Sequence, residues 1–568
     1  MERIEVKEIS FRYGEGEPAL RRISLEVRKG ERIAVLGPNG SGKTTFACCI
    51  NGLLVPTEGE VLVDGLSPAE HPYEVRRRVG MAFQNPDSQI VSAVVEREVA
   101  FGLENLGVPP SEMRGRVAEA LERFGLSDRR LHPPHRLSGG EKGRLILASL
   151  WAMRPRYLVL DEPTSLLDPE GRREVREAID ELAREGVAVL WITQYPEEAL
   201  WADRVLIFFG GELVADGPPS RVLSDPERLA RWGLRAPFPV LLNHRLRSLG
   251  LSLSPWTPTL RDLADALSAL PHSHTSALPY SHTPTLPHPE RLLARRISYS
   301  YPPPGPQALR RVDLRAGAGE FVALLGHTGS GKTTLAQILA GLLKPSEGQV
   351  LLDGGEVKRG RVGLAFQFPE EGFFEETVLE DVAFGPRNLG LPDPESHAHR
   401  ALSRVGLDPE VFGPRSPFSL SGGEARKVGI AGVLAVDPEV LILDEPTAGL
   451  DPEGALGLSE VLRALRRDGR TLVLISHDMD LVAELAERAV VLRHGEVWAE
   501  GPAVEVLSRS DLGEVGLEPP QPVTLARLLR ERGWPVPLAP LTSDELISQI
   551  LGSVRCAPTR YGKPEVDG

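Results

Sequence analysis

The chain has 568 residues, of which 41% are hydrophobic and 25% charged, a composition typical of globular proteins and a length that calls for several domains. Its net charge of −14 argues against general nucleic-acid binding, and its three cysteines form neither a disulfide framework nor a zinc pattern. Because no apolar run approaches the ~20 residues of a membrane span and the charged start is unlike a signal peptide, we expect a cytoplasmic protein.

The first segment, residues 1–30, alternates apolar and polar side chains around a turn at Gly14–Pro18, which predicts a small antiparallel sheet. Tyr13 lies at this turn, where an aromatic ring ahead of a phosphate loop can stack on adenine. The alternative is a half-buried strand aromatic. The recurrence of a tyrosine in the second half, as Tyr301, favours the adenine role.

A phosphate-binding loop follows as Gly37-Pro-Asn-Gly-Ser-Gly-Lys-Thr44, between the apolar run Ile33–Leu36 and a helix-permissive run. The glycines let backbone N–H groups point at phosphate oxygens, and the next helix adds its positive end. Lys43 can reach the β- and γ-phosphates, and the Thr44 hydroxyl can ligate Mg²⁺. The pattern recurs as Gly326-His-Thr-Gly-Ser-Gly-Lys-Thr333, so we expect two sites for a nucleotide and Mg²⁺.

Two further segments contribute polar groups. Val79–Gln84 reads as a strand ending in a glutamine, whose amide oxygen can coordinate Mg²⁺ or the attacking water, with a surface polar residue as the alternative. Leu137-Ser-Gly-Gly-Glu141 opens a predicted helix and offers a second anion-binding surface, with a simple N-cap as the alternative. Both patterns recur, as Gln367 and as Leu420-Ser-Gly-Gly-Glu424.

Tyr157-Leu-Val-Leu-Asp161 is a continuous apolar run, typical of a central parallel strand, and it ends in two acids. Carboxylates at that end of a strand lie where α/β sheets bind ligands. Asp161 suits Mg²⁺, and Glu162 can accept a proton from water that attacks the γ-phosphate. The next predicted strand ends at Gln194, and Arg204–Gly217 reads as a hairpin with Phe208 and Phe209 in the core.

The second half of the chain repeats the first, and each half ends in a small segment that we expect to be helical. The Pro/His-rich stretch between the halves reads as a solvated linker, with a metal-binding tract of His272, His274, His282 and His288 as the alternative. The expected domains are 1–225 (nucleotide domain), 226–270 (appendix), 271–290 (linker), 291–508 (second nucleotide domain) and 509–568 (C-terminal appendix).

Together these motifs resemble the ATP-binding cassette (ABC) family. The resemblance implies an α/β fold of two tandem P-loop domains, each with a parallel-sheet core, an antiparallel β subdomain and a helical subdomain. It also implies that the cassettes pair head to tail within the chain, so that each ATP meets the loop of one and the signature of the other. The catalytic residues so implied are the glutamates Glu162 and Glu445 with the switch residues Gln194 and His477. The Mg²⁺ ligands are Thr44, Gln84, Asp161, Thr333, Gln367 and Asp444.

The ATP-contacting residues expected in the first half are Tyr13, Gly37, Pro38, Asn39, Gly40, Ser41, Gly42, Lys43, Thr44, Thr45, Gln84, Ser138, Gly139 and Gly140. Those expected in the second half are Tyr301, Gly326, His327, Thr328, Gly329, Ser330, Gly331, Lys332, Thr333, Thr334, Gln367, Ser421, Gly422 and Gly423.

The segments after Gln84 and Gln367 are similar to those of the paired ATPases of energy-coupling factor (ECF) transporters. That resemblance implies a motor at the cytoplasmic face of the membrane, driving uptake of a vitamin or transition-metal ion with a transmembrane coupling subunit and a substrate-binding membrane subunit. It also implies a groove for a coupling helix, which Ile90, Val91, Phe373 and Phe374 can line unless they pack in the core.

One departure from the family pattern is Gln194, where the family has a histidine, as at His477. Glutamine cannot become cationic, so we expect unequal sites unless glutamine suffices. The rival class is a soluble twin-cassette ATPase acting on the ribosome or nucleic acid, but the linker is not basic and zinc-binding cysteines are missing. A third possibility keeps the motor and changes the partners to those of an exporter or of an importer that uses a binding protein.

Overall fold

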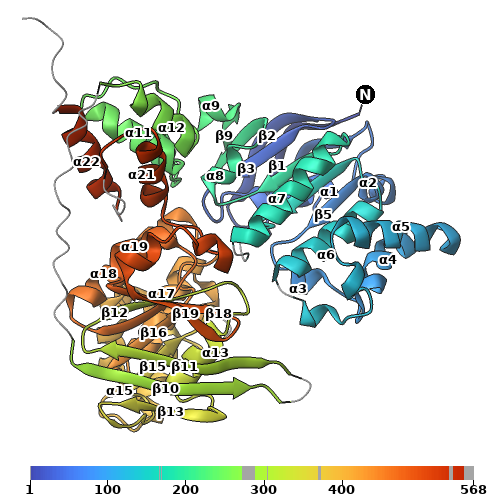
Figure 1. Cartoon of the computed structure of the whole chain (residues 1–568). Coiled ribbons are helices and arrows are strands. Elements are labelled where there is room, and N and C mark those ends of the chain that lie inside the picture. The colour runs from blue at the N-terminus through green and yellow to red at the C-terminus, as the bar shows by residue number, and fades with distance from the viewer. Residues whose placement is uncertain are drawn as a thin grey trace, which may run out of the picture. The chain divides into compact units, whose positions relative to one another are not determined.

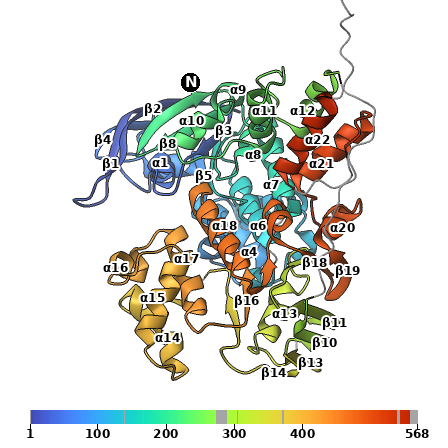
Figure 2. The same cartoon turned by 90° about the vertical axis from the view of Figure 1, so that its left-hand side faces the viewer.

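The computed structural model describes residues 2–137, 139–164, 167, 169–271, 288–302, 305–368, 372–536 and 542–555 (Figures 1 and 2). The chain divides into two compact units. The first is Met1–Pro237 with the short segments Leu420–Glu424 and Thr447–Gly457, and the second is Phe238–Ser419, Ala425–Pro446 and Leu458–Gly568.

A six-stranded sheet forms the centre of the first nucleotide domain. Its order is β5 (Val79–Ala82), β6 (Tyr157–Asp161), β7 (Ala188–Ile192), β3 (Arg32–Leu36), β8 (Arg204–Phe209) and β9 (Glu212–Gly217). The first five strands are parallel and β8–β9 is an antiparallel hairpin, as predicted. Strands β6 and β7 are buried along their whole length, which explains their continuous apolar sequence. The prediction for Phe209 was wrong: as the last residue of β8 it turns away from buried Phe208 and is 41% exposed.

An antiparallel sheet of β2 (Pro18–Arg28), β1 (Arg3–Arg12) and β4 (Glu58–Val63) confirms the prediction for residues 1–30. Its buried face belongs to the same hydrophobic core as the parallel sheet. The helices of this unit are α1 (Lys43–Asn51), α2 (Pro72–Arg78), α3 (Pro86–Gln89), α4 (Val95–Asn105), α5 (Pro110–Arg123), α6 (Gly139–Ala152), α7 (Pro169–Arg184), α8 (Pro196–Ala199), α9 (Pro219–Val222) and α10 (Pro226–Arg231). Among them, α4, α5 and α6 pack on one another as the helical subdomain.

The second nucleotide domain repeats this plan, which confirms the predicted fold class and the duplication. Its six-stranded sheet has the order β15 (Val362–Ala365), β16 (Val440–Asp444), β17 (Thr471–Ile475), β12 (Phe321–Leu325), β18 (Arg488–Arg493) and β19 (Glu496–Pro502). The antiparallel sheet has the order β11 (Gln307–Gly317), β10 (Glu290–Ser300), β13 (Glu347–Leu352) and β14 (Gly355–Glu356). The helices are α13 (Lys332–Leu339), α14 (Val378–Asn388), α15 (Pro394–Arg404), α16 (Pro409–Phe412), α17 (Gly422–Leu434), α18 (Pro452–Arg467), α19 (Met479–Leu485) and α20 (Ala503–Leu507).

The two appendices form one body within the second unit, a pairing that the sequence did not predict. Helices α11 (Phe238–Ser248) and α12 (Leu260–Ser268) share a hydrophobic core with α21 (Gln521–Glu531) and α22 (Ser543–Arg555) (Figures 1 and 2). The packing is reciprocal. Helices α11 and α12 of the first half are equivalent to α21 and α22 of the second, and α12 lies on α21 just as α22 lies on α11. Two ion pairs cross the same boundary, Arg245–Asp544 at 2.6 Å and Arg532–Asp265 at 2.7 Å. The repeat units therefore meet through equivalent faces, as in an isologous dimer.

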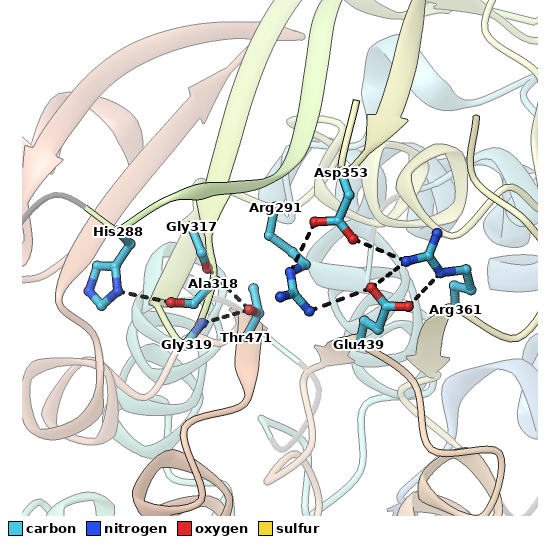
Figure 3. A network of polar contacts seen from close by, with 9 residues as sticks. All are labelled: His288, Arg291, Gly317, Ala318, Gly319, Asp353, Arg361, Glu439 and Thr471. Atoms are coloured by element: carbon cyan, nitrogen blue, oxygen red, sulfur yellow. Dashed lines mark hydrogen bonds and ion pairs between the residues drawn. The ribbon is translucent and has the colours of Figure 1, made fainter. Parts of the chain in front are cut away.

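Polar contacts tie the start of β10 to the parallel sheet (Figure 3). Arg291 and Arg361 both contact Asp353 and Glu439, with Arg361 Nη2 donating to Glu439 Oε2 at 2.6 Å. These groups are partly exposed, so their net contribution to stability is small, and they join the antiparallel sheet to the residues that precede β15 and β16.

His288 was expected to belong to the solvated linker or to a metal-binding tract, and its observed contacts differ from both. Its Nδ1 donates to the Ala318 carbonyl at 3.0 Å (Figure 3), and its Nε2 lies 3.0 Å from Glu487 Oε2. The hydrogen bond to Glu487 is the main cause that raises the pKa of His288. His272, His274 and His282 lie outside the described residues.

Candidate functional site

Each phosphate loop curls around the ammonium group of its own lysine. Lys43 Nζ donates to the carbonyls of Gly37 and Pro38 at 2.7 and 2.8 Å. Lys332 repeats this with Gly326 and His327, at 2.6 and 3.0 Å. Burial lowers the pKa of Lys43, and the nearby carboxylates, Glu162 foremost, oppose that shift.

Glycine is required where each loop enters its helix. Gly42 has a φ of 100°, and a Cβ there would lie 2.4 Å from the Ala19 carbonyl oxygen. Gly331 has a φ of 103°, and its Cβ would lie 2.7 Å from the Ala308 carbonyl oxygen. The antiparallel sheet thus approaches the loop so closely that any side chain collides with backbone.

Two of the three predicted Mg²⁺ ligands of each domain, the threonine and the aspartate, meet at the carboxyl edge of the parallel sheet, whereas Gln84 donates its amide to Glu162. Thr44 Oγ1 donates to Asp161 Oδ2 at 2.7 Å, and Thr333 Oγ1 donates to Asp444 Oδ2 at 2.8 Å. Burial is the main cause that raises the pKa of both aspartates. A hydroxyl beside a carboxylate is a hard oxygen donor set, which fits Mg²⁺ completed by phosphate and water oxygens.

Glu162 is held by two carboxamides. Gln194 Nε2 donates to Oε1 at 2.6 Å, and Gln84 Nε2 donates to Oε2 at 2.9 Å. Gln194 also reaches Asn39 Oδ1 of the phosphate loop at 3.1 Å. Burial raises the pKa of Glu162, with the Gln194 hydrogen bond acting against it. The structure therefore brings the predicted glutamate, the switch residue and the glutamine after β5 together.

Glu445 has a different partner. The backbone N–H of His477 donates to its Oε2 at 3.1 Å, and His477 Nε2 lies 3.2 Å from its Oε1. Both glutamates have left-handed backbone, with φ of 50° at Glu162 and 47° at Glu445. Such strain in a residue other than glycine is typical of functional positions. The two glutamates thus share one backbone conformation and differ in the groups that face their carboxylates.

The tyrosines predicted to stack on adenine point their hydroxyls at the helix after the phosphate loop. Tyr13 Oη lies 3.2 Å from Thr45 Oγ1, and Tyr301 Oη lies 2.9 Å from Thr334 Oγ1. Tyr13 is 57% exposed, so it is not the half-buried strand aromatic that was the alternative.

The signature glycines begin two helices. Gly139 starts α6 and Gly422 starts α17, whereas Ser138 lies outside the described residues. Ser421 and Glu424 form a reciprocal capping pair, with Ser421 N donating to Glu424 Oε2 at 2.8 Å and Glu424 N donating to Ser421 Oγ at 3.4 Å. The simple N-cap considered as the alternative is thus present in the second half. The N-terminus of the capped helix can still bind an anion.

Sequence reasoning missed a polar link beside Gln194. The Arg172 guanidinium lies 3.9 Å from the ring centre of Tyr195, donates to its hydroxyl at 2.8 Å, and donates to the Leu167 carbonyl at 3.0 Å. The repeat has Ala455 at the position of Arg172, so the link is specific to the first half. Comparing the two halves residue by residue was the signal that could have revealed it.

Two phosphate loops, each with its threonine, aspartate and glutamate at the carboxyl edge of a parallel sheet, define a tandem P-loop nucleotide hydrolase. The ABC transporter family matches residues 20–165 and 309–448. The chain belongs to the ABC transporter family, and its cassettes bind and hydrolyse ATP.

Relatives match nearly the whole chain. An ABC transporter ATP-binding protein of Methanosarcina acetivorans is 36% identical over 95% of this chain and 92% of its own length. One of Caldanaerobacter subterraneus is 36% identical over 93% of this chain and 96% of its own. Among solved structures, the archaeal ribosome recycling factor aABCE1, in complex with the ribosomal stalk protein aP1, has 20% identity and a TM-score of 0.57, covering 89% of this chain and 92% of that one. This last likeness concerns the fold alone.

In the part of the chain that the structure describes, none of the helices combines the length and apolarity needed to cross a membrane.

Proposed function

We propose that the chain is the ATP-hydrolysing motor subunit of an ECF-type membrane importer, which takes up a vitamin or a transition-metal ion. It would work at the cytoplasmic face of the membrane with a transmembrane coupling subunit and a substrate-binding membrane subunit. The proposal builds on the resemblance of the segments after Gln84 and Gln367 to those of ECF ATPases.

The observation that carries the proposal is a repeated set of exposed apolar residues within residues 83–101 and 366–384, the stretches that contain these two glutamines. The first set is Phe83, Val91 and Phe101, and the second, at equivalent positions, is Phe366, Phe374 and Phe384. Val91 is 62% exposed and Phe374 is 58% exposed, so neither packs in the core, while Ile90 and Phe373 are half-buried. Exposed apolar side chains recurring at one functional position favour an interaction surface for an apolar partner.

The chemistry proposed for each site follows from its contacts. Lys43 and the loop N–H groups bind phosphate, and Thr44 with Asp161 holds Mg²⁺, which neutralises charge on the phosphates when bound. Glu162, whose pKa burial raises, orients water and accepts its proton. The same roles fall to Lys332, Thr333, Asp444 and Glu445. We further propose that each ATP is completed by the signature of the opposite cassette, Ser421 for the first site and Ser138 for the second.

The second candidate is a soluble twin-cassette ATPase acting on the ribosome or nucleic acid. The aABCE1 likeness does not favour it, because it lies at 20% identity and reflects shared cassettes. The net charge of −14 and the Pro/His-rich stretch between the halves weigh against a nucleic-acid partner.

Affinity purification from detergent-solubilised membranes, followed by mass spectrometry, tests the proposal. We expect two small integral membrane proteins at a fixed stoichiometry. The Val91→Glu and Phe374→Glu double variant should lose them, and the matched Tyr73→Glu variant, which alters an exposed tyrosine of α2, should keep them. Ribosomal proteins in place of membrane proteins would favour the second candidate.

A further inference from the structure

A buried carboxylate holds the segment that follows Gln84. Glu98, on α4, is only 5% exposed. Its Oε2 accepts hydrogen bonds from the backbone N–H groups of Val91 and Ser92, at 3.0 and 2.7 Å. Hydrogen bonds to an ionised acceptor are about twice as strong as neutral ones. One carboxylate oxygen therefore fixes two successive peptide groups of an otherwise irregular segment.

The second half makes the same contact with a different acid. Asp381 Oδ2 accepts from the N–H groups of Phe374 and Glu375, at 3.0 and 3.2 Å. Glu98 and Asp381 are each the fourth residue of their helix, α4 and α14. The side chains differ by one methylene group, yet the bonded backbone positions are equivalent. The two halves thus make the same backbone contact with different acids, which favours a role beyond local packing.

We call these backbone hydrogen bonds to Glu98 or Asp381 the clamp. In the first half, the segment from Gln84 to Ser92 connects the ATP site with the exposed residue Val91, and the clamp holds the end of that segment. On one side, Gln84 at the start of the segment donates to Glu162. On the other, the clamp holds the backbone of Val91, one of the most exposed apolar residues of the chain. Helix α4, which carries Glu98, packs on α5 and α6. In the second half, the Phe374 ring also packs edge to face on Phe384 of α14, with centroids 4.6 Å apart.

We propose that Glu98 and Asp381 are positioning residues that lock the exposed apolar residue, Val91 or Phe374, to the helical subdomain. A partner pushing on that residue then moves α4, and with it α6, which begins at the signature glycines; in the second half it moves α14, which packs on α15 and α16. Without the clamp the segment moves on its own. The displacement caused by the partner is then not transmitted to the ATP site. The inference rests on the proposed function for its partner, whereas the clamp itself is a property of this chain.

Hydrogen exchange of the full-length protein tests the clamp. Glu98→Leu removes the acceptor at similar volume, so the amides of Val91 and Ser92 should exchange about tenfold faster or more. Glu98→Gln keeps an acceptor oxygen without the charge and should have a smaller effect. Glu104→Leu, which changes an exposed acid of the same helix, should leave these amides unchanged. Unchanged exchange in Glu98→Leu would overturn the inference.

The coupling is tested with the membrane partners that co-purify with the chain. In the Glu98→Leu and Asp381→Leu double variant, we expect partner-stimulated ATPase to fall at least fivefold in kcat, with little change in KM for ATP, because neither acid is among the residues expected to contact ATP. Faster exchange with undiminished stimulation would overturn this inference alone. Absence of any membrane partner of the wild-type chain would overturn the proposed function, and this inference with it.

Discussion

Gln194 Nε2 lies 2.6 Å from Oε1 of Glu162, in the place where the second half puts an imidazole beside its glutamate. An amide supplies a hydrogen bond but no positive charge. Histidine can become cationic and stabilise the charge that develops on the γ-phosphate. One chain thus carries two versions of a single site.

This difference predicts unequal loss of activity when each glutamate is replaced. Glu445→Gln should remove most of the ATPase of the full chain, roughly tenfold or more, whereas Glu162→Gln should cost roughly twofold. Steady-state phosphate release at saturating ATP measures both. As a control, Gln194→His in the Glu445→Gln background should restore part of the lost activity. Equal losses for the two glutamates would contradict the proposal of unequal sites.

The entry to the first phosphate loop predicts a contrast between two neighbouring glycines. Gly42→Ala should lower the free energy of unfolding of the first unit by about 3 kcal/mol, because its Cβ collides with the Ala19 carbonyl. Gly40→Ala is the matched control: its φ is 74° and its Cβ meets nothing within 4 Å, so only about 1 kcal/mol of backbone strain is expected. Urea titration followed by tryptophan fluorescence measures both, and equal effects would refute the close approach.

The shared core of the appendices predicts that the two halves stay together after the chain is cut. A protease site inserted between residues 272 and 287 should give fragments that co-elute in gel filtration without ATP, because α11 and α12 stay packed on α21 and α22. The same cut in a Leu263→Asp and Leu267→Asp variant, which charges fully buried positions of α12, should release the fragments. Separation of the unsubstituted fragments would contradict the packing.

The contacts of His288 predict a pH-dependent contribution to stability. Glu487 raises the pKa of His288, so the folded state binds its proton more tightly than the unfolded state. The contribution is fully present below the ordinary pKa of about 6.5 and is lost as pH rises through the higher folded value. Because His288 is partly exposed, we expect at most about 1 kcal/mol.

The free energy of unfolding of His288→Gln should therefore fall below that of the wild type mainly at acidic pH, with the gap closing as pH rises. Paired urea titrations between pH 5.5 and 8.5 would show it. A gap that widens toward alkaline pH would refute the assignment.

The sequence was informative where local rules act. The loop Gly37–Thr44 needs its glycines because of backbone conformation, and β6 needs its apolar run because both faces are buried, so both could be predicted. Contacts between distant segments obey no local pattern. The reciprocal packing of α12 on α21 and the clamp from Glu98 to Val91 each depend on how the chain folds back. The Arg172–Tyr195 link belongs to no motif, so only the difference between Arg172 and Ala455 in a comparison of the two halves pointed to it.

The most direct test of the importer motor is the ATPase rate of the chain with and without the membrane proteins that co-purify with it. The account predicts that these proteins, returned to lipid vesicles, raise ATP hydrolysis several-fold. The rise should vanish in the Glu162→Gln and Glu445→Gln double variant and in the Val91→Glu and Phe374→Glu double variant. An ATPase rate that membrane proteins leave unchanged, and that purified ribosomes stimulate instead, would contradict it.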